Sequence, residues 1–233
     1  MRNHLTLGVI LTIASIPTTA RASFHSKIAD GAVPAQSTQG RQVIDRVAVR
    51  IEGDIITESQ VRELGQFQKL VDGQAKPRNE LIQELIDQWI ARGEAQANRY
   101  PAPSSADVDH AFSQLASQFS SPQEFERRYT QEGLSTLAVR RLLEEQLYLA
   151  RFLDYRFRPA AQVTDAQVEN FYRDEFSPQV KQRNQQVPGL DSVEDTIREV
   201  LIQRAINDRA TQWLDDTRER LKIEVVSPEG ARP

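Results

Sequence analysis

The alternating apolar side chains near residue 50 constrain the fold more than any other feature of the sequence. Val47, Val49 and Ile51 alternate with small or polar neighbours at the two-residue period of a half-buried strand. The turn residues Glu52-Gly53-Asp54 separate them from a second apolar pair at positions 55–56. The pattern therefore predicts a β-hairpin.

An isolated hairpin is marginally stable in water and needs a third strand or a helix against its apolar face. The only other strand-like run in the sequence is Lys222-Ile223-Glu224-Val225-Val226. We therefore expect a mainly α-helical fold with a small antiparallel sheet, in which the hairpin within residues 43–58 meets the strand at 222–226. Thr57 followed by Gln60 fits a capping box, so the hairpin should lead directly into a helix.

Apolar residues recur at helical spacing through the rest of the chain. The clearest helix includes residues 81–90 and should run to about Tyr100, before Pro101 and Pro103. Residues 177–190 are polar and contain Pro and Gly, which predicts a mobile connector. The other predicted helices run from Thr57 to Gly73, from Ser105 to Phe119, from Ser121 to Gly133, from Ser135 to Phe157, from Thr164 for roughly three turns, and from Ser192 for about 28 residues.

The first 22 residues have the pattern of a secretory signal peptide. Arg2 provides positive charge, residues 5–16 are an apolar core, and Ala20-Arg21-Ala22 is a small-x-small cleavage site. We expect cleavage after Ala22 and a periplasmic protein, with an uncleaved anchor as the alternative. Residues 23–42 are expected to form a flexible leader, and residues 227–233 a tail.

Composition gives little support to an enzyme or to a nucleic-acid protein. The formal net charge is -4, there is no cysteine, and the three histidines lie far apart in sequence. His110 and the paired acids, such as those at 144–145, fall on predicted helices where solvated faces explain them. The sequence contains no catalytic motif, no Gly-rich phosphate loop and no metal-ligand spacing. We expect no catalytic residues, no cofactor, no metal, no nucleic-acid partner and no stable membrane insertion after signal removal.

Three segments resemble a known family. Residues 44–61 are similar to the opening of the SurA-type periplasmic chaperone domain, which is related to PrsA foldases. Residues 163–172 resemble the segment that precedes the parvulin isomerase domain in that family, and residues 210–225 resemble its closing helix and strand. The resemblance covers most of residues 43–226 and implies an ATP-independent chaperone for unfolded polypeptides, outer-membrane proteins among them.

The sequence departs from the family where a parvulin domain is usually inserted. Only residues 174–192 occupy that place, which is too short for a folded domain. A chaperone domain without its isomerase is therefore expected, and prolyl isomerase activity is a minor alternative by family label alone. The main alternative is a structural or assembly subunit that forms a homodimer or larger oligomer through the long C-terminal helix.

Aromatic residues are the candidate peptide-binding residues. They can form the helical core or line an apolar groove for extended polypeptide, and the sequence leaves both interpretations open. Micromolar binding needs about 8 kcal/mol, and each buried large apolar side chain offers about 1.5–3 kcal/mol. Because ordering a client costs part of that free energy, about four to six contacts are needed. The candidates are Phe67, Trp89, Phe112, Phe119, Phe125, Tyr129, Phe152 and Phe171.

Overall fold

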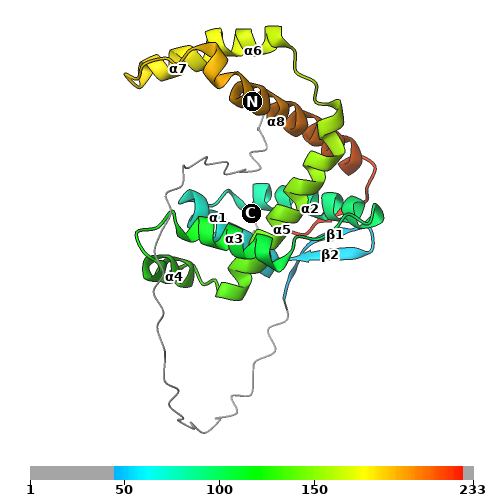
Figure 1. Cartoon of the computed structure of the whole chain (residues 1–233). Helices are drawn as coiled ribbons and strands as arrows, with labels where there is room; N and C mark the ends of the chain where they lie inside the picture. The colour runs from blue at the N-terminus through cyan, green and yellow to red at the C-terminus, as the bar shows by residue number, and fades with distance from the viewer. Residues whose placement is uncertain (1–44, 228–233) are drawn as a thin grey trace, which may run out of the picture. The chain divides into compact units, whose positions relative to one another are not determined.

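A three-stranded antiparallel sheet joins the two ends of the region that the computed structural model describes, residues 45–227 (Figure 1). Strand β1 (Val47–Ile51) is central, with β2 (Asp54–Thr57) on one side and β3 (Ile223–Val225) on the other. This confirms the predicted sheet. The predicted signal peptide, leader and most of the tail lie outside the described residues.

The register of the sheet buries one face of β1. Val49 lies opposite Ile56 on β2 and Val225 on β3. A register shift between Val47 and Val49 places an extra residue in β1, so the consecutive residues Ala48 and Val49 are both fully buried. The backbone bulge therefore explains why the buried side chains depart from strict alternation.

The described region is mainly α-helical, as predicted. A 3-10 turn (Arg158–Ala160) follows α5, and a π-helical turn (Tyr172–Phe176) lies between α6 and α7. The helices are α1 (Glu58–Asp72), α2 (Arg78–Ala97), α3 (Ser105–Ala116), α4 (Pro122–Gln131), α5 (Thr136–Phe157), α6 (Asp165–Phe171), α7 (Ser177–Gln182) and α8 (Leu190–Arg218). None of the helices between positions 45 and 227 combines the length and the apolar character that a membrane span requires.

Side-chain caps define most helix starts. Thr57, Ser121, Ser135 and Thr164 accept backbone N–H donors in the first turns of α1, α4, α5 and α6, as the sequence predicts. Helix α3 is capped by Ser104 instead of Ser105, because Ser104 forms a reciprocal capping box with the residue three positions later.

Two expectations for residues 177–192 are wrong. Residues 177–182 are helical (α7) instead of belonging to a connector, and Pro178 is tolerated because it lies in the first turn. Helix α8 begins at Leu190, so Ser192 lies inside its first turn, where its hydroxyl donates to the carbonyl oxygen of Gly189 at 2.7 Å. Tyr172 Oη donates to the carbonyl oxygen of Pro188 at 2.7 Å and fixes the returning chain.

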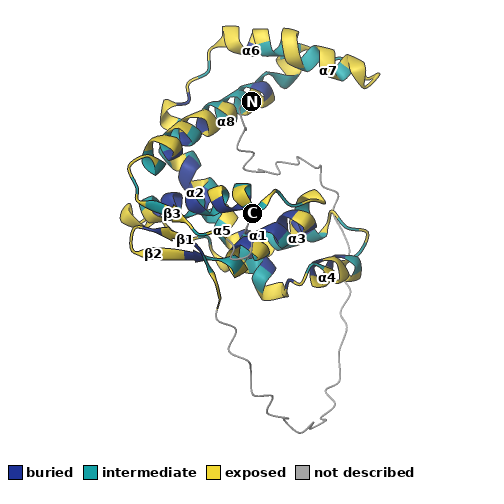
Figure 2. Cartoon of the chain, turned by 180° about the vertical axis from the view of Figure 1, so that it is seen from behind, coloured by how far each residue is buried: buried dark blue, intermediate teal, exposed yellow. Residues whose placement is uncertain are grey.

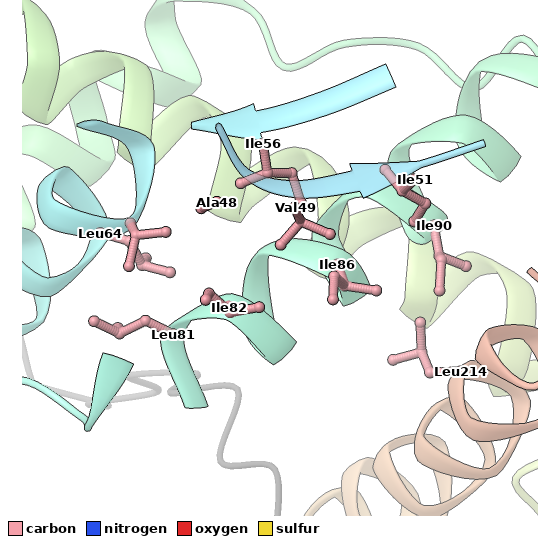
Figure 3. Close-up of a cluster of buried hydrophobic side chains, with 11 residues drawn as sticks. Ala48, Val49, Ile51, Ile56, Leu64, Leu81, Ile82, Ile86, Ile90 and Leu214 are labelled. Atoms are coloured by element: carbon pink, nitrogen blue, oxygen red, sulfur yellow. The ribbon is translucent and has the colours of Figure 1, made fainter. Parts of the chain in front are cut away.

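The first core lies between the sheet and helices α1, α2 and α8. Figure 3 shows Val49 and Ile51 from β1 pointing toward Ile86 and Ile90 of α2, with Leu214 of α8 closing the cluster. All five side chains are buried. Since each buried aliphatic side chain of this size contributes about 1.5–3 kcal/mol, this cluster holds the terminal strands on the helical body.

A second core joins helices α1, α3, α4 and α5. Its buried residues are Phe67, Leu70, Leu115, Phe125, Tyr129, Leu134, Val139 and Leu143. Helix α6 packs separately on the first half of α8 (Figure 2). Val168 of α6 and Ile197 of α8 are buried. Arg198 of α8 extends that contact, because it pairs with Asp165 at 2.8 Å.

Candidate functional site

A groove of about 560 Å³ opens between the N-terminal ends of α3 and α5. Its apolar surface comes from Pro103, Val108, Leu137 and Ala138. Leu137 is 77% exposed, which is unusual for a large aliphatic side chain. We call this cavity the α3–α5 groove, and its lining is Pro103, Ser105, Val108, Ser135, Leu137, Ala138, Arg140, Arg141 and Glu144.

Ion pairs fix the two walls of the α3–α5 groove. Asp107 of α3 pairs with Arg151 of α5 at 2.7 Å, and Asp109 pairs with Arg140. Hydrogen bonds from Arg151 and Ser104 hold the pKa of Asp107 well below its ordinary value. The groove is therefore bounded by two helices that are tied together, and its width does not depend on a loop.

The arginines of the α3–α5 groove already have acidic partners. Arg140 pairs with Asp109 and also lies over the Phe112 ring, 5.3 Å from its centroid. Arg141 pairs with Glu63 of α1. Because these pairs neutralise much of the positive charge, the apolar side chains offer the main attraction to a ligand.

Tyrosines form an aromatic cluster further along α5. The Tyr100 ring centroid lies 6.0 Å from that of Tyr148, 5.6 Å from that of Phe152 and 5.3 Å from that of Tyr155. The Tyr148 hydroxyl donates to the carbonyl oxygen of Tyr100 at 3.3 Å. Tyr155 is 64% exposed, so one ring of the cluster faces solvent.

The groove and the tyrosine cluster share one side of α5. Leu137, Glu144, Tyr148 and Tyr155 follow one another at intervals of seven, four and seven residues, which superimposes them on one helical face. We call these four residues the α5 face. At 1.5 Å per residue the α5 face extends over about 27 Å, the length of about eight residues of extended chain.

A second groove, of about 590 Å³, lies between α1, the start of α2 and the end of α4. Charged side chains pair with each other across its rim. Glu58 pairs with Arg78, and Lys69 pairs with Glu132 at 3.8 Å. Seven of the eleven residues that line it carry charged or amide side chains, against three of nine in the α3–α5 groove, so the second groove is less suited to an apolar polypeptide.

Four of the predicted peptide-binding residues belong to the core. Phe67, Phe125, Tyr129 and Phe152 are buried, and the Tyr129 hydroxyl lies 2.9 Å from Thr136 Oγ1. An apolar ligand would reach these four rings only after rearrangement of the core. These four residues therefore belong to the helical core and do not line a groove.

The other four predicted residues are half-buried. Trp89 Nε1 donates to the Asp54 carboxylate at 3.0 Å and ties α2 to the hairpin. Phe112 and Phe119 pack against the buried Phe125 ring, and Phe171 lies under the Arg204 guanidinium. Neither groove is lined by any of the eight predicted residues.

Sequence reasoning missed the residues that the α3–α5 groove exposes. Leu137 lies two positions after the cap Ser135 and off the stripe that includes Leu142 and Leu143. An apolar residue outside the stripe of an otherwise amphipathic helix is the signal that could have identified it.

No group of three or more His, Cys, Asp or Glu side chains between positions 45 and 227 could hold a metal ion.

The fold defines a mainly α-helical protein with a small closing sheet. Comparison of the chain with protein-family models and with curated proteins found no match.

Proposed function

We propose that the protein is an ATP-independent periplasmic chaperone that binds extended segments of unfolded polypeptide, including outer-membrane proteins, along the α5 face. The observation that carries the proposal is the exposure of Leu137 and Tyr155 on one helix face that also borders an apolar groove. Large apolar side chains that are exposed beside a groove are typical of interaction sites. The resemblance of three sequence segments to SurA-type chaperones supports the same class.

The dimensions of the α5 face suit a weak and unselective binder. A client of about eight extended residues places about four side chains on the bound side, since side chains alternate. Contacts with Leu137, Tyr148 and Tyr155 of the α5 face and with Pro103 of the adjoining groove, at about 1.5–3 kcal/mol each, reach the 8 kcal/mol of micromolar binding only if most are made. Release therefore needs no nucleotide hydrolysis.

A chaperone without an isomerase domain agrees with the chain between α6 and α8. Residues 172–182 are helical, and Tyr172 binds Pro188 just before α8. The short return of this segment to α8 supports the proposal of a chaperone domain without an inserted isomerase domain. We therefore do not propose prolyl isomerase activity.

The proposal is tested with the mature protein, residues 23–233, and a chemically unfolded outer-membrane protein as client. The wild type should delay aggregation of the client, and Leu137→Asp combined with Tyr155→Ser should weaken this effect at least fivefold. The matched control is Ile55→Ser, which removes a side chain that is 52% exposed on β2, away from the α5 face. Equal activity of the wild type and the double variant would refute binding at the α5 face, and an inactive wild type would refute the chaperone function.

A structural subunit is the second candidate. Val200 on α8 is 39% exposed, and a homodimer through α8 would cover it. Light scattering of the mature protein distinguishes the two functions. A dimer that Val200→Arg converts to a monomer would favour the structural role, whereas a monomeric wild type would exclude that role.

A further inference from the structure

Asp87 is a carboxyl group of α2 that lies in the interior, with 5% of its surface exposed. Arg218, in the last turn of α8, faces it, and Arg218 Nε lies 2.8 Å from Asp87 Oδ1. Although this distance makes an ion pair, neither Asp87 oxygen accepts a well-aligned hydrogen bond. The carboxylate has therefore lost its water without gaining a full set of partners.

Asp87 shares the Arg218 guanidinium with a second acid. Arg218 Nη2 also binds Asp215 Oδ1 at 2.5 Å, so two carboxylates depend on one positive charge. Glu84 lies one turn before Asp87 on α2 and pairs with Lys76. Burial, with Asp215 and Glu84 adding to it against the opposing effect of Arg218, raises the pKa of Asp87 to about 6.

The other elements packed on α2 present different groups. Strand β1 and helix α1 contribute apolar core side chains, such as Val49, Ile51 and Leu64. Helix α5 contributes Glu145 and Arg156, which pair with residues further along α2. The charges that act on Asp87 thus come mainly from the C-terminal end of α8.

The Asp87–Arg218–Asp215 cluster lies where α8 is docked and the chain continues into β3. Leu214, one turn before Arg218, is buried against α2 and β1 (Figure 3). Strand β3 begins at Ile223, shortly after α8 ends. Undocking of this end of α8 would return Asp87 to water, and its pKa would fall toward the ordinary value of 3.8.

We propose that Asp87, Arg218 and Asp215 form a proton-sensitive latch that holds the end of α8, and with it β3, more tightly in acid than at neutral pH. Docking takes up a proton when the docked carboxyl has the higher pKa. The stabilisation of the docked state by this proton is fully present below pH 3.8 and is lost as pH rises through about 6. From pH 5 to pH 7.5 the docking equilibrium should weaken by about tenfold.

Hydrogen exchange of residues 219–226 tests the latch, with rates corrected for the intrinsic pH dependence of exchange. In the wild type, the protection factors of residues 219–226 should fall about tenfold between pH 5 and pH 7.5. Asp87→Asn is nearly isosteric with the wild type and should remove this pH dependence. Asp216→Asn, which alters an exposed acid on the same turn of α8, should keep it.

A second variant keeps the test informative if Asp87→Asn fails to fold. Asp215→Asn removes the second carboxylate that shares Arg218, so it should lower the pKa of Asp87 and reduce the pH dependence of protection. Equal wild-type protection at pH 5 and pH 7.5 would overturn the proposal. An unchanged pH dependence in either Asp87→Asn or Asp215→Asn would do the same.

Discussion

Glu52 and Lys222, which are 170 positions apart, bind each other through two hydrogen bonds. The backbone N–H of Glu52 donates to the carbonyl oxygen of Lys222 at 3.1 Å, and the backbone N–H of Lys222 donates to the Glu52 carboxylate at 2.9 Å. Glu52 also adopts a φ of 51° in the hairpin turn, a conformation that favours glycine. The hydrogen bond to Lys222 gives a reason for glutamate at this strained position.

Replacement of Glu52 by alanine should weaken closure of the sheet. Glu52→Ala removes the side-chain acceptor, whereas Glu52→Gln keeps one, and both retain a non-glycine residue at positive φ. We expect Glu52→Ala to lower the free energy of unfolding by about 1 kcal/mol relative to Glu52→Gln, measured by urea denaturation. Equal stability of the two variants would show that the side-chain hydrogen bond contributes nothing.

The capping box of α1 should contribute a similar free energy to stability. Thr57 Oγ1 accepts the backbone N–H of Gln60, and the Gln60 side chain accepts the backbone N–H of Thr57. Thr57→Ala should cost about 1 kcal/mol of stability, and Thr57→Ser should cost much less, because serine preserves the acceptor. Thermal denaturation of the two variants checks this, and a serine variant as unstable as the alanine variant would point to lost methyl packing instead.

Two glycines should respond to alanine with opposite signs. Gly133 has a φ of 79°, and a Cβ there would lie 3.0 Å from Gln66 Nε2, so Gly133→Ala should destabilise the protein by about 1–2 kcal/mol. Gly93 lies inside α2 with nothing within 4 Å of its added Cβ. Gly93→Ala should therefore stabilise by about 0.5–1 kcal/mol. Urea denaturation compares the pair, and a change of the same sign in both would contradict this account.

Acid should weaken the contact between α8 and the 3-10 turn that follows α5. Hydrogen bonds from Arg158, and then from Gln203, lower the pKa of Glu199 from 4.5 to about 2. The resulting stability is present above pH 4.5 and is lost as pH falls through about 2. The Glu199 side chain is 41% exposed, so solvent screening limits the effect to about 0.5–1 kcal/mol.

Arg158→Met tests this contact. The variant should show a smaller loss of stability between pH 4.5 and pH 2 than the wild type in urea denaturation series. Arg127→Met, which breaks an exposed pair with Glu124 on α4, is the matched control and should leave the pH profile unchanged. A pH profile that Arg158→Met leaves unchanged would exclude Glu199 as the titrating group.

Local signals in the sequence predicted much of the fold. Capping patterns at Thr57, Ser121, Ser135 and Thr164 identify helix starts because one side chain satisfies backbone donors within the same turn. That β3 joins the hairpin was also predictable, since no other strand-like run offers a partner, but the sequence did not show that its neighbour is β1. Residues 177–182 were missed because their polar composition resembles that of a connector, and tertiary contacts such as that of Tyr172 with Pro188 leave no local pattern.

The candidate site was less predictable than the fold. Aromatic residue type alone does not distinguish a buried ring, such as Phe67, from an exposed one, such as Tyr155. That difference depends on which helix faces meet, and thus on contacts between residues distant in sequence. The exposure of Leu137 shows the same limit, because it depends on which faces of α5 the other helices cover.

The pairing of β1 with β3 has a consequence for synthesis. A ribosome makes β1 early, but the strand that completes its second edge is made only after all of α8. During that interval the nascent chain exposes an unpaired edge that is open to mispairing with other chains. Completion of the sheet must therefore follow translation of nearly the whole described region, and intermediates with a free β1 edge should be the ones most prone to aggregate.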